Sequence, residues 1–318
     1  MKTQQLGTSE VKDASAVALG VMRISEKSAD EAIQVVNAAL EAGINFFDTA
    51  DIYGAGKSST VFGQALKDAQ VNREDIYLQS KGGIILPDGQ INGDGLKGPR
   101  FDFSKDHLIA SVDIELERLQ TEYLDFFLLH RPDVLMEVDE IAEAFSELKA
   151  SGKVRNFGVS NFTPLQIQLL QQATDQRLEV NQLQFGLGHA DMISETLLLN
   201  MGEERSIERT FDSLTFAQLN KITIQAWSPF QYGMFEGVFV DSPKFGKLND
   251  TLQALADKYG VTKNGIAVAW INRHPAGIQT IIGSMNPTRI KEMSDIDSVN
   301  LTKQEWYDLY LAAGNILP

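Results

Sequence analysis

The chain has 318 residues, of which 43% are hydrophobic and 22% are charged, and its formal net charge at pH 7 is −15. This length fits two ordinary domains or one large α/β barrel, and it allows a core that needs no disulfide or structural metal. The negative charge disfavours nucleic acid as a partner. The absence of cysteine excludes thiolate zinc sites, iron–sulfur clusters and cysteine nucleophiles.

Targeting and membrane signals are weak in this sequence. No apolar run approaches the ~18 residues that a membrane-spanning helix requires. The apolar stretch 14–22 follows Glu10 and Asp13 and lacks the sustained hydrophobic region of a signal peptide, so we interpret it as the first strand. We expect a cytoplasmic protein with no membrane partner.

Short apolar runs alternate with longer segments of helical periodicity, as in repeated βα units. Eight strands are predicted, near residues 17–20, 44–47, 76–80, 124–129, 155–159, 179–184, 222–227 and 278–282. Helices are predicted near 29–43, 58–69, 104–119, 136–151, 163–173, 212–220, 247–259, 262–273 and 287–293. This succession favours a (β/α)₈ TIM barrel in a single domain, residues 1–318, over a doubly wound sheet.

Residues at the helix ends support these boundaries. Ser104 and Thr163 stand at N-cap positions, and Pro164 follows at a first helical position. Glycines that favour a left-handed conformation end three of the helices: Gly43, Gly152 and Gly260.

Three segments interrupt the alternation. Residues 84–103 are rich in glycine and proline, residues 186–212 form a long connection, and the chain from 300 continues into a helix near 302–313. Long loops in a compact domain are usually functional. We expect all three at the carboxyl face of the barrel, where they would shape a pocket.

Two glycine-rich motifs match phosphate-binding patterns without the required context. Residues 93–98 read GDGLKG, but no strand precedes them and no helix follows. Residues 54–59 read GAGKSS, but Asp51 stands where a Walker A loop needs its first glycine. These motifs do not predict nucleotide hydrolysis.

The four histidines do not predict a metal site. None is spaced to pair with another as metal ligands, so we expect no metal. His107 and His274 fall in or next to helical segments and are predicted at the surface. His189 falls in the long loop, where solvent exposure is also expected.

Four ionisable residues follow or end three successive strand-like runs: Asp48, Tyr53, Lys81 and His130. The carboxyl ends of parallel strands meet on one face, so we expect these side chains to converge. A nearby lysine charge would favour ionisation of a tyrosine and make it a general acid for carbonyl reduction, with an aspartate holding the lysine. A histidine would then stabilise negative charge on the carbonyl oxygen. Each residue alone is explained as easily by a cap, a loop aromatic, a solvated strand end or a core histidine.

Over roughly residues 17–295 the chain resembles the aldo-keto reductase superfamily, and most closely a bacterial branch of poorly characterised reductases. The matching segments, in chain order, are FDTADIYG (47–54), SKGG (80–83), LLHRPD (128–133), GKVRNFGVSNF (152–162), VNQ (180–182), WSPF (227–230), IIGS (281–284) and PTRI (287–290). The resemblance implies reduction of an aldehyde or ketone with NADPH, and a catalytic tetrad of Asp48, Tyr53, Lys81 and His130. Tyr53 would be the general acid.

The resemblance also implies a cofactor site for NADP(H) in preference to NAD(H), with Asp48 among the cofactor contacts. Ser160, Asn161 and Gln182 would hydrogen-bond the nicotinamide carboxamide, and Trp227 would stack on the ring. Further contacts would follow the first strand, at Gly20, Met22 and Arg23, and line the pyrophosphate, at Ser228, Phe230 and Gly233. The adenosine end would meet Ile282, Gly283, Ser284 and Arg289, with Arg289 on a 2′-phosphate.

Some positions depart from the family pattern. Gly283 stands where many members have a lysine, and Met293 lies near a position where many have asparagine, so the preference for NADP rests mainly on Arg289. Trp227 as a core residue and Arg289 on a solvated helix face are the alternatives. A module on the same fold that senses redox state or docks to a partner, as potassium-channel beta subunits do, is the alternative to an enzyme. Neither the oligomeric state nor the substrate is predicted.

Overall fold

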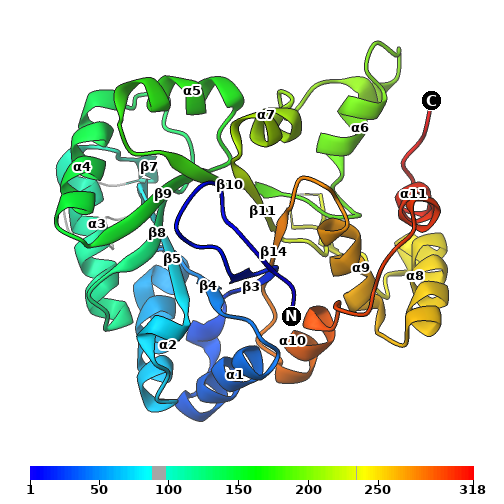
Figure 1. Ribbon diagram of the computed structural model, residues 1–318, viewed down its shortest axis with the longest axis horizontal. Helices are drawn as coiled ribbons and strands as arrows, with labels where there is room; N and C mark the ends of the chain where they lie inside the picture. Colours follow the sequence, from blue (N-terminus) through cyan, green and yellow to red (C-terminus); the bar gives the residue numbers. More distant parts are fainter. Residues whose placement is uncertain (88–97, 234) are drawn as a thin grey trace.

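The computed structural model describes residues 1–87, 98–233 and 235–318. Within these ranges, eight parallel strands close into a barrel (Figure 1). They are β3 (Val17–Gly20), β4 (Phe46–Asp48), β5 (Tyr77–Gly82), β8 (Leu124–Leu129), β9 (Val154–Ser160), β10 (Leu178–Gln184), β11 (Thr223–Trp227) and β14 (Gln279–Ile282). Each strand pairs with the next along the chain, and β14 pairs with β3. The predicted (β/α)₈ barrel is confirmed, and the doubly wound sheet is excluded.

Helices surround the barrel in Figure 1. Those that follow strands are α1 (Ala29–Glu41), α2 (Lys57–Asp68), α3 (Lys105–Leu119), α4 (Val138–Ala150), α5 (Pro164–Ala173), α7 (Ser213–Asn220), α8 (Gly246–Tyr259), α9 (Lys263–Asn272) and α10 (Pro287–Ser294). The carboxyl-terminal helix α11 (Lys303–Ala312) was also predicted, whereas the short α6 (Asp191–Leu197) was not. The Ser104 and Thr163 caps form, because each side chain accepts a backbone hydrogen bond from the first helical turn.

The amino-terminal end of the barrel is closed by a hairpin of β1 (Thr3–Gln4) and β2 (Ala14–Ser15). The Gly7 amide donates to the Thr223 hydroxyl at 2.8 Å, at the start of β11. Apolar side chains of the hairpin join a buried cluster inside the barrel, made by Leu6, Val11, Ala14, Ala18, Phe46, Phe126, Leu128, Val180 and Ile281. With this end plugged, the carboxyl ends of the strands are the open face on which a site can form.

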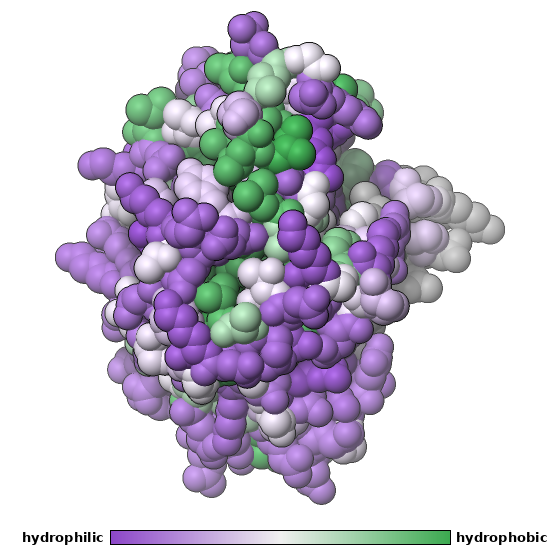
Figure 2. Space-filling model, turned by 90° about the vertical axis from the view of Figure 1, so that its right-hand side faces the viewer, coloured by the Kyte–Doolittle hydropathy of each residue, from purple (hydrophilic) through white to green (hydrophobic). Residues whose placement is uncertain are grey.

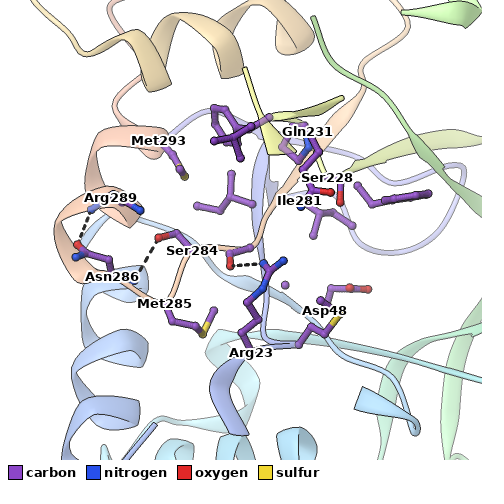
Figure 3. A pocket seen from close by; sticks show the side chains of 18 of the residues that line it. Arg23, Asp48, Ser228, Gln231, Ile281, Ser284, Met285, Asn286, Arg289 and Met293 are labelled. Atoms are coloured by element: carbon purple, nitrogen blue, oxygen red, sulfur yellow. Dashed lines mark hydrogen bonds between the residues drawn. The ribbon is translucent and has the colours of Figure 1, made fainter. Parts of the chain in front are cut away.

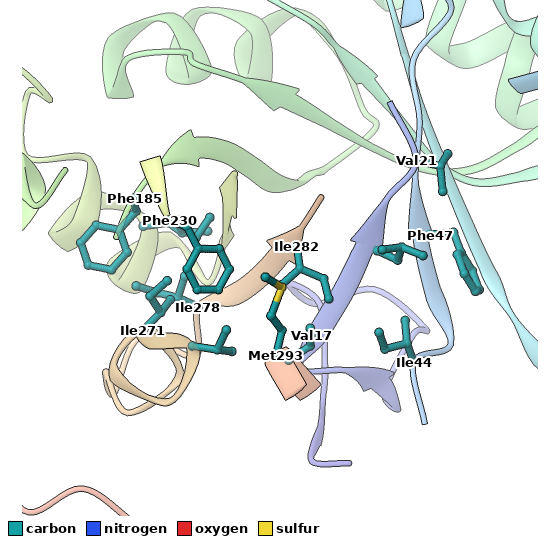
Figure 4. Packing of buried hydrophobic residues seen from close by; sticks show 14 of the residues in the cluster. Val17, Val21, Ile44, Phe47, Phe185, Phe230, Ile271, Ile278, Ile282 and Met293 are labelled. Atoms are coloured by element: carbon teal, nitrogen blue, oxygen red, sulfur yellow. The ribbon is translucent and has the colours of Figure 1, made fainter. Parts of the chain in front are cut away.

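The larger core lies between the strands and the surrounding helices. Figure 4 shows part of it, where Ile282 of β14 and Val17 of β3 lie between helix residues such as Ile271 and the neighbouring strand residue Phe47. Helix α11 extends this core beyond the barrel, because Trp306 stacks on Trp270 of α9 with ring centroids 4.8 Å apart. Each indole N–H also donates to the backbone carbonyl of the other tryptophan at 3.0 Å.

The long segments form small structures of their own. Residues 84–103 contain the antiparallel pair β6 (Ile84–Ile85) and β7 (Arg100–Phe101), and residues 186–212 contain α6. Most of the predicted motif 93–98 lies outside the described residues.

The face shown in Figure 2 is largely hydrophilic, with a few apolar patches. No helix in the described ranges has the length and apolar character needed to cross a membrane.

The predicted surface position of His107 is wrong. Its side chain is buried, and a ring nitrogen lies 3.2 Å from the Ser111 hydroxyl one turn along α3. His274 and His189 are partly buried rather than fully exposed. The sequence pattern misplaced His107 because the buried face of α3 includes polar positions as well as leucine and valine.

Candidate functional site

Lys81, near the end of β5, is fully buried and joins three groups at the carboxyl end of the barrel. Its ammonium donates to Asp48 Oδ2 at 2.8 Å, to the Thr49 carbonyl at 2.7 Å and to the Tyr53 hydroxyl at 3.2 Å. The predicted convergence of Asp48, Tyr53 and Lys81 is therefore present in the structure.

Asp48 ends β4 and is held by amides from the barrel interior. Gln79 Nε2 and Gln182 Nε2 donate to Asp48 Oδ1 at 2.7 and 3.0 Å. Both also reach Gln225 Oε1, at 2.8 and 3.3 Å, and Gln225 in turn donates to Gln279 Oε1 at 2.8 Å. These four glutamines, the interior amide chain, form a polar layer above the apolar plug and fix the carboxylate that holds Lys81.

Burial and a neighbouring charge act in opposite directions on the pKa of Lys81, and likewise on the pKa of Tyr53. Burial alone would lower the pKa of Lys81, but the Asp48 carboxylate and Tyr53 outweigh it, so the pKa is raised and the ammonium stays charged. Burial raises the pKa of Tyr53, and the Lys81 charge offsets this only in part. The expectation of a more acidic tyrosine is therefore not met, and Tyr53 holds its proton at neutral pH.

His130 directly follows β8 and stands edge-on to the Tyr53 ring, with centroids 5.7 Å apart. It is almost fully buried, and its Nδ1 has no hydrogen-bond partner in the part of the chain that the structure describes. Burial lowers the pKa of His130 well below its usual range, and the charges of Lys81 and Arg131 lower it further. The imidazole is neutral at physiological pH and can act as a hydrogen-bond donor rather than as a cation.

A cavity of about 780 Å³ opens above these residues and runs across the carboxyl ends of β3, β9, β10, β11 and β14. Tyr53 and His130 line it, and Lys81 lies beneath them. Most of the predicted cofactor contacts also line the cavity: Gly20, Met22, Arg23, Asp48, Ser160, Asn161, Gln182, Trp227, Ser228, Phe230, Ile282, Gly283, Ser284 and Arg289.

Gly233 is the predicted contact that does not line the cavity. It has a φ of +57°, and an added Cβ would lie 2.5 Å from the Glu236 side chain. It lies between β12 (Gln231–Tyr232) and β13 (Gly237–Val238), where the positive φ favours glycine. Residues 84–103, 186–212 and the carboxyl-terminal tail were also expected to shape the pocket, but none of their described residues lines this cavity.

One end of the cavity is basic and rich in hydrogen-bonding groups (Figure 3). Arg23, after β3, reaches towards the Gly283 carbonyl, with Nη1 at 3.5 Å. Asn286 caps α10 by accepting from the Arg289 amide at 3.1 Å. Arg289 forms no ion pair among the described residues, so its guanidinium is available to an anion at this end.

The other end of the cavity is formed by the ends of β9 and β11. Asn161 has a φ of +63°, and its side chain links Ser160 Oγ, 2.7 Å from Nδ2, to the Trp227 indole N–H, 3.2 Å from Oδ1. Trp227 is half-buried with Phe235 stacked at 6.1 Å, so it is a cavity wall rather than a core residue. Among the described residues, no cluster of three histidine or acidic side chains is placed to hold a metal.

Residues 16–310 match the model of the aldo/keto reductase family. The chain belongs to this family. It is 33% identical over 315 residues to the 6-dehydroglucose reductase of Agrobacterium fabrum, covering 98% of each chain. It is also 33% identical over 287 residues to the oxidoreductase YdhF of Escherichia coli, covering 90% of this chain and 88% of the other. An aldo/keto reductase of Klebsiella pneumoniae, solved with NADP and acetate, shares the fold with a TM-score of 0.77 at 23% identity over 99% and 96% of the two chains.

This aldo/keto reductase has cavity residues that the sequence did not single out. They come from α1 and the residue before its cap, the loop after β8, the segment after β11, the start of α9 and the connection between β14 and α10: Lys27, Glu31, Gln34, Arg131, Gln231, Phe235, Val238, Val240, Asp241, Asn264, Met285 and Asn286. Arg131 had a sequence signal, because it directly follows His130 at a strand end. The residues after β11 had none, since nothing in their composition separates them from an ordinary surface loop.

The reductase also buries two neighbouring acidic residues, Glu115 and Asp51. Glu115 of α3 accepts from the Ser80 and Ser59 hydroxyls at 2.6 and 2.8 Å and pairs with Arg118 at 3.2 Å. Asp51 is fully buried close to Glu115. Burial and the nearby Glu115 charge raise the pKa of Asp51 to about 8, so Asp51 is protonated at neutral pH.

Proposed function

We propose that this chain reduces an aldehyde or ketone to an alcohol with NADPH, with Tyr53 as the general acid, and that it does so as a single barrel domain. The observation that carries this proposal is the Asp48–Lys81–Tyr53 chain of hydrogen bonds, which ends at a hydroxyl facing the cavity. A protonated tyrosine with a buried ammonium beside it can give its proton to a carbonyl oxygen, because the ammonium stabilises the phenolate that remains.

Each residue of the proposed tetrad has a separate task. Lys81 lowers the cost of forming the Tyr53 phenolate, and Asp48 keeps Lys81 charged inside the barrel. His130, neutral and next to Tyr53, donates a hydrogen bond that orients the carbonyl oxygen and stabilises its developing charge. A bound NADPH supplies the hydride.

The cavity fits a nicotinamide dinucleotide in size and charge. Its volume of about 780 Å³ lies in the range of cofactor pockets, and it runs from Tyr53 to the basic end at Arg289. Ser160, Asn161 and Gln182 would hold the carboxamide, and Trp227 would stack on the ring. Arg289 would hold the 2′-phosphate, because a guanidinium donates paired hydrogen bonds to phosphate oxygens. The Klebsiella reductase on the same fold was solved with NADP, which supports this choice.

The test is a pair of measurements on the purified protein. Quenching of tryptophan emission on titration with NADPH and NADH measures binding near Trp227, and loss of NADPH absorbance with a panel of aldehydes measures turnover. We expect tight NADPH binding, weaker NADH binding and reduction of several aldehydes. Failure to bind either nucleotide would overturn the proposal.

The alternative function is a redox-sensing or partner-docking module that binds the cofactor with little turnover. The same pair of measurements separates the two functions, since NADPH binding with no reduction of any aldehyde would favour the module. The names of the curated relatives, which include reductases from Agrobacterium and Escherichia coli, support the enzyme.

A further inference from the structure

Arg131 occupies a distinctive place beside the proposed catalytic groups. It directly follows His130 at the end of β8, and it lines the cavity together with Tyr53 and His130. Its guanidinium carbon lies 5.6 Å from the centre of the Trp227 ring. Arg131 is half-buried, and burial lowers its pKa. The guanidinium therefore sits at the substrate end of the cavity and is partly withdrawn from water.

Arg131 has no carboxylate partner within ion-pair distance among the described residues. Other partly buried arginines of this chain are paired: Arg73 lies 2.7 Å from Asp125, and Arg118 lies 3.2 Å from Glu115. Removing a cation partly from water without a nearby negative charge costs free energy. A bound anion would offset this desolvation cost.

The carboxylates that line the same cavity are already engaged. Asp48 is paired with Lys81, Glu31 with Lys27 and Asp241 with Lys263. In a protein with a net charge of −15, the Arg131 guanidinium is therefore a positive charge without a carboxylate partner among the described residues, and it lies where the carbonyl would react. The stacked rings of Trp227 and Phe235 add an apolar wall next to it.

We propose that Arg131 binds an anionic group of the carbonyl substrate, a carboxylate or a phosphate, and thereby determines specificity. This inference rests on the proposed function, since it places the anion on the molecule that is reduced. The guanidinium donates paired hydrogen bonds to two oxygens of the anion, and Phe235, beside Trp227, contacts the apolar part of the substrate.

The first test measures binding without turnover. Benzoate and its neutral isostere benzamide are titrated calorimetrically into the complex with NADP⁺, for the wild type, Arg131→Gln, Arg131→Lys and Arg209→Gln. Arg209 is exposed and outside the cavity lining, so its variant matches the charge change alone. We expect the wild type and Arg209→Gln to prefer benzoate by about 10- to 100-fold. Arg131→Gln should lose this preference, and Arg131→Lys should keep part of it.

The second test measures turnover of 4-carboxybenzaldehyde and 4-carbamoylbenzaldehyde, and of glyceraldehyde 3-phosphate and glyceraldehyde. Arg131→Gln should raise KM for the anionic member of at least one pair about 10- to 100-fold, with a smaller change in kcat, and the affected pair identifies carboxylate or phosphate. No preference for an anion in either pair, together with equal binding of benzoate and benzamide, would overturn the anion site while leaving the reductase proposal intact. A benzoate preference that depends on Arg131, without reduction of any aldehyde, would instead support the anion site and count against the reductase.

Discussion

Gln182 Nε2 of β10 lies 3.0 Å from Asp48 Oδ1 of β4, so two residues 134 positions apart in the sequence meet inside the barrel. Gln182 was predicted as a cofactor contact, and it does line the cavity. It also belongs to the interior amide chain of Gln79, Gln182, Gln225 and Gln279. The proposed catalytic group therefore rests on a connected polar layer, in which loss of one member leaves other buried groups unpaired.

Replacing the middle of the interior amide chain should destabilise the fold. Gln225→Leu removes the acceptor of both Gln79 and Gln182 and the donor to Gln279, and we expect a loss of about 2 to 4 kcal/mol in the free energy of unfolding. Urea unfolding measures this. Gln253→Leu, on the exposed face of α8, is the matched control and should change stability by less than about 0.5 kcal/mol. Equal effects of the two substitutions would contradict the role given to the chain.

The buried Asp51 predicts a pH-dependent stability. The folded protein keeps the Asp51 proton up to a pKa of about 8, whereas the unfolded chain releases it near the ordinary value of 3.8. Between these values the native state binds more protons, so this group lowers the free energy of unfolding as pH rises, and the effect levels off above pH 8.

Asp51→Asn removes this titration. Between pH 6 and pH 8 its stability relative to the wild type should therefore rise by about 2 to 3 kcal/mol, since each pH unit corresponds to about 1.4 kcal/mol. Urea unfolding of both proteins at the two pH values gives the difference, in which the titration of other groups cancels. A difference that does not change with pH would show that Asp51 ionises normally.

Close packing between α2 and α3 predicts a severe effect at Gly63. A Cβ there would lie 2.4 Å from the Arg118 carbonyl oxygen and 2.7 Å from the Leu119 backbone. Gly63→Ala should therefore cost about 1 to 3 kcal/mol, although alanine is the better helix former. Gly246→Ala, at the start of α8 with no atom within 4 Å of the added Cβ, should be neutral or stabilising by up to about 1 kcal/mol. Thermal unfolding of both variants decides whether the helices can move apart.

The proposed phosphate contact predicts a selective change in cofactor affinity. Arg289→Gln should weaken NADPH binding about 10- to 100-fold and leave NADH binding nearly unchanged, because the 2′-phosphate is the group that the guanidinium would bind. Lys291→Gln, on the same helix but paired with Glu41, is the control for charge. Tryptophan quenching reports both affinities. A parallel loss of NADPH and NADH would mean that Arg289 supports the fold of the site rather than the phosphate.

Much of the architecture could be predicted because apolar runs mark buried parallel strands directly. All eight barrel strands were predicted close to their observed bounds, as was α5 with Thr163 and Pro164 at its start. The seven-residue α6 was missed because it has no side-chain cap and too few turns for a clear period. Of the cavity lining after β11, Ser228 and Phe230 were predicted from the family resemblance, whereas Phe235 was missed because a loop has no periodicity to read.

The electrostatics of the site could be predicted only in part. The pairing of Lys81 with Asp48 follows from residue types at neighbouring strand ends. The direction of the Tyr53 pKa does not, because it depends on how far burial outweighs the lysine charge. The burial of Asp51 could not be predicted either, because a polar residue in a loop after a strand is usually exposed to solvent.

The central claim is tested most directly by Tyr53→Phe. This variant keeps the ring and removes the hydroxyl, while Lys81 retains its contacts with Asp48 and the Thr49 carbonyl. Single-turnover reduction of an aldehyde that the wild type accepts should slow about 10²- to 10⁴-fold, with NADPH affinity unchanged. Reduction at the wild-type rate would contradict Tyr53 as the proton donor.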